Sequence, residues 1–226
     1  MTASKPWVAP ALLIFLLAAC ASSSLAPVLL TLPPAGVSVV GSVVGSVAAS
    51  PGGSVGSVAA PVGGTAAASA MPAVHLLAVR RVNIPEYLVA RRVRYRADAS
   101  TLAEWPNTYW AERIEVGVSR EFVSALRQQL PAWTMCDLNC ADQVPALTVQ
   151  VDLLPMDFLR SAQKLQAGAR ITLSGPGVSP KVIRTVELAY DLPASADTAQ
   201  AQAQTMATLI QQVAAAAAPI IRAARP

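Results

Sequence analysis

Hydrophobic and polar positions divide the 226-residue chain into three stretches. An apolar run covers residues 8–17, small residues dominate 33–72, and alternating or amphipathic segments follow from residue 73. No charged residue occurs between Lys5 and Arg80. Because periodic placement of large apolar residues is typical of packed strands and helices, we predict one folded domain over 73–226.

Within 73–226 the pattern predicts several strands and two helices. Strands are expected over 73–82, 87–96, 147–153, 167–173 and 182–190, with a further short strand over 101–105. Helices are expected over 111–130 and from Ser195 or Asp197 onward, the second kinked or ended early by Pro219. Turn residues between the last three strands favour an antiparallel meander. The expected fold class is α+β, a mostly antiparallel sheet with two helices packed on one face, preceded by a flexible low-complexity tether.

The stretch over 33–72 repeats Gly-Ser-Val and lacks large side chains. Such a composition buries too little apolar surface to offset the entropy of ordering the chain, so we predict a flexible tether. About fifty residues of this kind would span about 40 Å and hold the domain away from a membrane. Proteolysis there should release a fragment beginning near Ala73. Strand pairing by the valines is the alternative, and residues 28–32 could add a short strand that docks on the domain.

Residues 17–20 read Leu-Ala-Ala-Cys, which resembles the lipobox of a bacterial lipoprotein signal peptide. The apolar run before them is shorter than the roughly 20 residues that span a bilayer, which suits a cleaved signal over 1–19. The resemblance implies that Cys20 carries the lipid and that 20–72 joins it to the domain. The alternatives are an ordinary cleaved signal with an incidental cysteine, and an uncleaved N-terminal helix.

Two short motifs in the predicted domain resemble a known family. The first motif precedes a basic strand and consists of Pro85, Glu86, Tyr87 and Leu88. The second opens a helix that ends at Leu130 and consists of Trp110, Ala111 and Glu112. Their order and spacing over 73–215, together with the lipobox, resemble the ABC-transport auxiliary lipoproteins of the PqiC (YmbA) type. Without the resemblance, Pro85 is simply a turn residue, and Tyr87 and Trp110 are packed aromatic side chains.

The resemblance implies a non-enzymatic lipoprotein on the periplasmic face of the outer membrane. Ala21 and Ser22 suit that location, because no Asp follows the cysteine. The implied partners are a periplasmic MCE-domain protein and, indirectly, an ABC permease and ATPase, which together move lipid between two membranes. Relatives can assemble as rings, so a homo-oligomeric ring is a further expectation. The alternative function is assembly of another envelope complex, of the lipopolysaccharide-export or pilus type.

Arginine is concentrated in the first part of the domain, at 80, 81, 91, 92, 94 and 96, where Glu86 is the only acidic residue. Guanidinium groups bind phosphate and carboxylate through paired hydrogen bonds. The candidate surface for an anionic lipid headgroup or an acidic partner is therefore Arg91, Arg92, Arg94 and Arg96. A solvated sheet face is the alternative. The net charge is +4, or +3 once Lys5 leaves with the signal, which is too small to indicate a nucleic acid partner.

Cys136 and Cys140 lie in a predicted loop between helix and strand. In an exported protein such a pair favours a disulfide, and two reduced thiols are the alternative. We expect no metal site, because a tetrahedral centre needs two further ligands and His75 is the only histidine. The sequence has no Gly-rich phosphate loop, nucleophile elbow or HExxH motif, so we expect neither a cofactor nor catalysis.

Overall fold

The computed structural model describes residues 26–34, 75–136, 140, 143–177 and 180–224. The predicted signal peptide, Cys20 and most of the predicted tether lie outside the described residues. The expectations for those segments therefore stay predictions.

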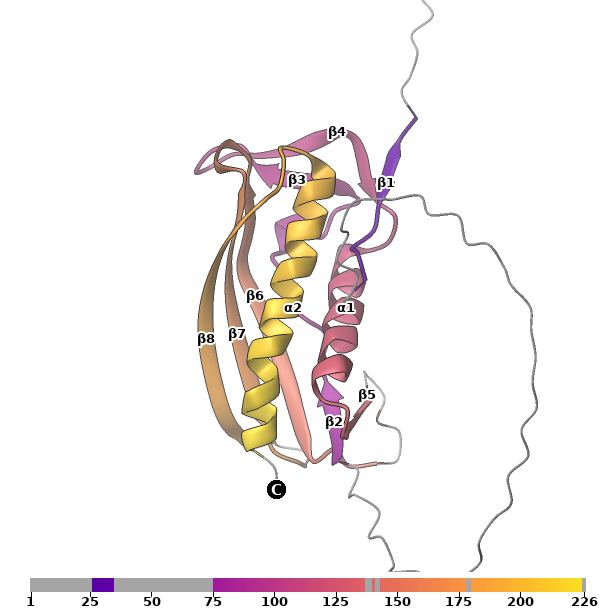
Figure 1. Cartoon of the computed structure of the whole chain (residues 1–226), viewed down its shortest axis with the longest axis vertical. Helices are drawn as coiled ribbons and strands as arrows, with labels where there is room; N and C mark the ends of the chain where they lie inside the picture. Colours follow the sequence, from indigo (N-terminus) through magenta and orange to yellow (C-terminus); the bar gives the residue numbers. More distant parts are fainter. Residues whose placement is uncertain (1–25, 35–74, 137–139, 141–142, 178–179, 225–226) are drawn as a thin grey trace, which may run out of the picture.

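Within the described residues, eight strands form one curved sheet and two helices lie side by side against it (Figure 1). The strands are β1 (Val28–Leu30), β2 (His75–Val79), β3 (Arg92–Arg96), β4 (Leu102–Trp110), β5 (Trp133–Cys136), β6 (Leu147–Leu159), β7 (Lys164–Ser174) and β8 (Val182–Pro193). The helices are α1 (Ile114–Gln129) and α2 (Ala199–Ala223). The strand order is β1-β4-β3-β6-β2-β5, with β7 paired to β6 and β8 to β7.

The sheet is mixed, so the predicted mostly antiparallel sheet is wrong. β1 runs parallel to β4, and β2 runs parallel to both β5 and β6. The pairs β3–β4, β6–β7 and β7–β8 are antiparallel. Side-chain alternation indicates a strand but not the direction of its neighbour. Because α1 lies between β2 and β5 in the chain, the return to the sheet is a crossover, and a crossover makes the pair parallel. The result is a half-barrel.

The second half of the domain follows the predicted pattern more closely. The antiparallel meander of β6, β7 and β8 is confirmed, and all three strands extend beyond their predicted ends. The predicted apolar stripe of α1 is buried from Ile114 to Leu126. α2 begins at Ala199, where the Thr198 side chain accepts a hydrogen bond from the Ala201 amide. α2 continues past Pro219 to Ala223, so of the two effects predicted for Pro219, a kink or an early end, the early end is wrong.

The first half of the domain differs from the predicted strands. Residues 86–88 form a 3-10 turn, and strand β3 begins only at Arg92. Pro106 and Asn107 lie inside β4 rather than ending it. Asn107 has φ of 47°, and the β3–β4 register shifts opposite these residues. An irregular pairing leaves room for a proline that has no amide hydrogen, and Asn adopts a left-handed conformation more readily than most residues.

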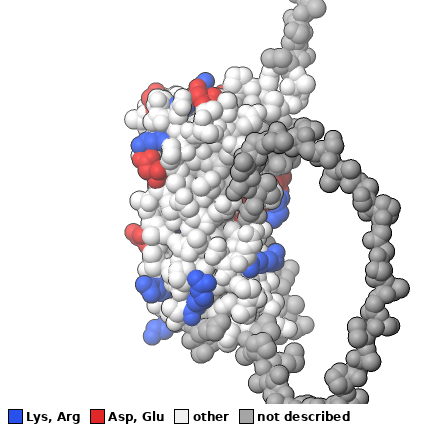
Figure 2. Space-filling view, in the orientation of Figure 1, with Lys and Arg blue, Asp and Glu red and all other residues white. Residues whose placement is uncertain are grey.

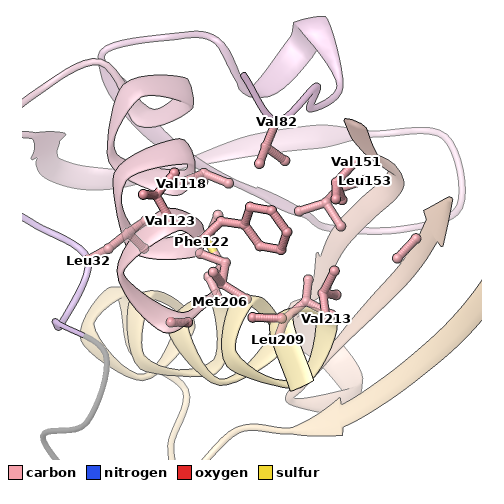
Figure 3. Close-up of a cluster of buried hydrophobic side chains, with 14 of the residues drawn as sticks. Leu32, Val82, Val118, Phe122, Val123, Val151, Leu153, Met206, Leu209 and Val213 are labelled. Carbon is pink, nitrogen blue, oxygen red and sulfur yellow. The ribbon is translucent and has the colours of Figure 1, made fainter. Parts of the chain in front are cut away.

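The core lies between the helices and the sheet (Figure 3). Phe122 of α1 is 2% exposed and lies among Met206 and Leu209 of α2 and Val151 and Leu153 of β6. α2 is long and apolar enough to cross a membrane, but half of its most apolar window is buried in the domain. Its packing on α1 and β7 accounts for this apolar composition.

The N-terminal segment 26–34 is part of this core. Leu32 is 3% exposed and lies beside Val123 of α1 (Figure 3). Leu30 is 8% exposed, and its carbonyl oxygen accepts a hydrogen bond from the Ala111 amide at 2.8 Å. β1 thus covers the free edge of β4, as the apolar pattern over 28–32 allowed.

Candidate functional site

The four arginines of the predicted basic surface have different surroundings. Arg92 and Arg94 both pair with Glu104 on β4, at 3.2 and 3.3 Å. Arg96 pairs with Asp157 on β6 at 3.0 Å. The guanidinium carbon of Arg91 lies 6.0 Å from the centre of the Tyr109 ring. Two carboxylates therefore lie beside three of the four guanidinium groups, which makes this surface less positive than the arginines alone indicate.

Tyr87 of the first family motif joins this region to β6. Its hydroxyl donates a hydrogen bond to Asp157 at 2.8 Å, and the same carboxylate accepts one from Arg96 at 3.1 Å. Burial, followed by the hydrogen bond and the negative charge of Asp157, raises the pKa of Tyr87 above its ordinary value. Tyr87, Arg96 and Asp157 therefore hold the 3-10 turn and β3 against β6.

The other motif residues also serve the fold. Pro85 is buried, and its carbonyl oxygen accepts the Leu88 amide at 2.9 Å, which closes the 3-10 turn. Trp110 is 5% exposed and pairs with Leu30 of β1. Glu112 accepts a hydrogen bond from Arg120 of α1 at 2.6 Å. Glu86 and Ala111 are exposed.

A buried polar contact joins three elements behind the arginines. The indole nitrogen of Trp105 on β4 donates to the Gln202 side chain on α2 at 2.7 Å. The Gln202 amide nitrogen in turn donates to the Arg94 carbonyl oxygen on β3, also at 2.7 Å. Because a buried polar group left without a partner is costly, this contact fixes β3, β4 and α2 relative to one another.

A second basic region lies immediately after β2, and we call it the Arg80–Arg81 surface. Both side chains are exposed, and neither makes an ion pair with an acidic group among the described residues. The Arg80 amide donates to the Val149 carbonyl oxygen at 2.9 Å, so β6 positions this segment. The next residue, Val82, donates its amide to the Ser119 hydroxyl on α1 at 3.0 Å.

Two hollows flank the Arg80–Arg81 surface. The larger, about 500 Å³, is lined by Ala78, Arg80, Arg81, Asn83, Cys140, Thr148 and Gln150. The smaller, about 210 Å³, lies towards α1 and is lined by Val79, Arg80, Arg81, Val116, Ser119, Arg120, Val123 and Arg127. Guanidinium groups beside amide, hydroxyl and apolar side chains suit binding of carboxylate or phosphate groups on a larger partner.

Charge is unevenly distributed over the molecule (Figure 2). Near the upper end of the face in Figure 2, basic and acidic side chains lie together, whereas Lys and Arg lie without acidic neighbours over its lower half. Lys181 and Arg184 near the start of β8 are exposed and make no ion pair with another described residue. Ion pairing therefore offsets part of the charge of the four sequence-predicted arginines, while Arg80, Arg81, Lys181 and Arg184 have no acidic partner among the described residues.

Cys136 and Cys140 are joined as a disulfide in the structure, with Cα atoms 5.2 Å apart. Cys136 ends β5, and Cys140 lines the larger hollow. Formation of this bond in the cell stays a prediction, which thiol alkylation with and without reductant checks.

His75 and the acidic residues offer no metal site in the described part of the chain. No three His, Cys, Asp or Glu side chains there lie close enough together to hold an ion. His75 instead packs against Trp133, with ring centres 5.1 Å apart, where β2 pairs with β5.

Comparison with known proteins gives the family. The model of the ABC-type transport auxiliary lipoprotein component family matches residues 57–218, more than two thirds of the chain. The chain therefore belongs to this family, whose members are lipoproteins associated with ABC-type transport. The match includes both sequence motifs and confirms the predicted resemblance of this chain to lipoproteins of the PqiC (YmbA) type. No curated protein matches the chain.

Solved structures share the fold. One, described as an uncharacterized protein, is 20% identical with a TM-score of 0.57, and the match covers 65% of this chain and 92% of that one. Another, protein XCC0632 from Xanthomonas campestris, is 13% identical with a TM-score of 0.53, covering 65% and 83%. At this identity the likeness concerns the fold alone.

Sequence reasoning found the motifs but not the Arg80–Arg81 surface as a separate site. It grouped these two arginines with the four that follow, because all six lie within a short stretch. The signal was present in the pattern, since Arg80 and Arg81 end one predicted strand while the others belong to the next. The pattern could not show that Glu104 and Asp157 lie beside three arginines of the second group and beside neither Arg80 nor Arg81.

Proposed function

We propose that this chain is a non-enzymatic accessory subunit of an MCE-protein and ABC-type system that moves lipid between the inner and outer membranes. The family match over 57–218 carries this proposal. Cys20 anchors the chain by its lipid in the outer membrane, with the domain on the periplasmic face. A homo-oligomeric ring is compatible with this arrangement and forms part of the proposal.

The Arg80–Arg81 surface is the docking site that we assign to the periplasmic MCE-domain protein. It carries two exposed guanidinium groups without acidic partners among the described residues, beside two hollows with mixed polar and apolar walls. Charged surfaces of this kind speed association and select an acidic partner. The surface formed by Arg91, Arg92, Arg94 and Arg96 is the weaker candidate for this partner, because Glu104 and Asp157 offset two of its four charges.

The test is purification of the full lipoprotein from membranes, with mass spectrometry of the proteins that accompany it. The wild type should retain an MCE-domain protein and ABC transport subunits. The double variant Arg80→Glu, Arg81→Glu should retain about tenfold less of these proteins, since reversing exposed charges turns attraction into repulsion. The matched control is Lys181→Glu, Arg184→Glu, which changes the charge by the same amount at the start of β8 and should keep the partners.

Three results would contradict parts of this proposal. Absence of transport proteins from the wild-type complex removes the accessory function. Recovery of lipopolysaccharide-export or pilus components in their place favours assembly of another envelope complex. Equal retention by wild type and the Arg80→Glu, Arg81→Glu variant, with equal melting temperatures, keeps the function but removes this surface as the docking site.

A further inference from the structure

The position of β1 changes the relation between the domain and the membrane. Val28 lies eight residues after Cys20. Eight residues reach at most about 29 Å, whatever conformation they adopt. Leu30 and Leu32 are buried in the domain, so a lipid on Cys20 would hold the domain within that distance of the bilayer.

The Gly-Ser-Val stretch consequently does not lie between Cys20 and the domain, as a tether would. It leaves the domain after Pro34 and returns at His75, because 26–34 packs in the core and His75 begins β2. A segment that starts and ends on one domain is a loop of that domain. Its length therefore does not enter the distance between Cys20 and the fold.

The strands next to β1 define which face would meet the bilayer. Leu29 pairs with Tyr109 on β4, and Tyr109 pairs with Arg92 on β3, so these side chains form a row across three strands. Leu29 is 57% exposed, and the Arg92 side chain is 50% exposed. The guanidinium carbons of Arg92 and Arg91 lie 5.3 and 6.0 Å from the centre of the Tyr109 ring. We call Leu29, Tyr109, Arg91 and Arg92 the β1 face.

The composition of the β1 face matches that of a membrane interface. An exposed Leu can enter the headgroup boundary, Tyr is enriched at that depth, and Arg extends its charge towards lipid phosphates. Arg91 makes no ion pair among the described residues, and Arg92 shares Glu104 with Arg94. Basic residues near an anionic leaflet are attracted to it over about a Debye length.

We propose that β1 acts as a clasp that holds the β1 face on the leaflet in which Cys20 is anchored, so that the domain lies on the membrane rather than at the end of a long tether. This inference rests on lipidation of Cys20, which is part of the proposed function. In this orientation the opposite end of the domain, where β8 begins, points away from that leaflet (Figure 1).

Photo-crosslinking in proteoliposomes tests the orientation. A benzoylphenylalanine is placed at Leu29 in the full lipoprotein, reconstituted in phosphatidylethanolamine vesicles with and without phosphatidylglycerol. The matched control carries it at Ile183, an exposed apolar residue of β8 that is 51% exposed. Lipid adducts should form at Leu29 and at least several-fold less at Ile183. Phosphatidylglycerol should increase the Leu29 adducts, and Arg91→Glu with Arg92→Glu should cancel the increase.

Two length variants test the clasp itself. One deletes residues 37–56, and the other inserts a Gly/Ser segment of the same length between Leu25 and Ala26. The deletion should leave Leu29 adducts unchanged, because it shortens only the loop. The insertion should lower them about sixfold, since effective concentration falls with about the 3/2 power of linker length. An effect of the deletion without an effect of the insertion would show that the loop is the tether after all.

Fatty-acid labelling separates failure of this inference from failure of the anchor. Label on the wild type but not on Cys20→Ser establishes the lipid. With the label present, equal adducts at Leu29 and Ile183 overturn the orientation, and unchanged adducts after the insertion overturn the clasp. Absence of label removes the lipid anchor from the proposed function, and this inference fails with it.

Discussion

Leu29 and Leu32 lie three residues apart, yet only Leu32 is buried, at 3% exposure against 57% for Leu29. Leu32 packs over Gly117 of α1, where its Cδ1 lies 3.6 Å from the position that a Cβ would occupy. The contrast arises because alternate residues of β1 face opposite sides of the sheet, and the chain then turns into the core. Burial of Leu32, and not of Leu29, therefore holds segment 26–34 on the domain.

Replacement of Leu32 by Ala should lower the free energy of unfolding by about 2–4 kcal/mol, because it removes buried methyl groups and leaves a cavity. Leu29→Ala is the matched control and should change it by less than about 0.5 kcal/mol. Chemical denaturation of a soluble form beginning at residue 21 measures both. Similar small changes for the two variants would mean that 26–34 does not pack on the domain in solution.

The arginines of β3 show why elements, rather than sequence neighbours, assign roles to charged residues. Arg96 is 19% exposed and Asp157 is 14% exposed, so their pair lies in a partly buried site between β3 and β6. Arg91 precedes the same strand but is exposed over the Tyr109 ring. Residues that look alike in the sequence thus divide into one that holds two strands together and one that is available to a ligand.

Arg96→Met should lower the free energy of unfolding by about 2 kcal/mol, because Asp157 loses a charge-assisted partner where solvent reaches it poorly. Arg91→Met should change the free energy by less than about 0.5 kcal/mol. Thermal unfolding at low and moderate salt compares them. If both variants unfold at the same temperature as the wild type, Arg96 has no structural role and returns to the candidate binding surface.

The elements themselves were predictable where local pattern decides them. Alternation together with Gly-Pro turns predicts β6, β7 and β8 and their antiparallel pairing, and helix periodicity predicts the buried side of α1. Parallel pairing of β2 with β5 and β6 was not predictable, since it depends on a crossover through α1 rather than on side chains. The pairing of Arg96 with Asp157 was equally hidden, because the two residues are 61 positions apart.

At the scale of the whole molecule, the low-complexity segment joins two fixed points of one domain, Pro34 at its start and His75 at its end. Its composition predicts a flexible chain. A flexible loop costs entropy when its ends are brought together, and this cost grows by about 0.6 kcal/mol for each doubling of length. A tether that hangs free at one end carries no such cost. The dependence of the free energy of unfolding on segment length therefore distinguishes a loop from a tether.

Deleting residues 37–56 halves the loop over 35–74 and should raise the free energy of unfolding by about 0.6 kcal/mol, whereas doubling the loop with Gly/Ser residues should lower it by about the same amount. Across this fourfold range the melting temperature should change by roughly 2–5 °C for a domain of this size. The matched control places the same insertion before Ala26 and should leave the melting temperature unchanged, because that position closes no loop. A flat series in the loop would place 26–34 outside the fold and restore the long tether as the link to the membrane. A falling series with a flat control would establish that 26–34 is part of the fold, so that the Gly-Ser-Val segment can vary in length without changing the number of residues between Cys20 and the domain.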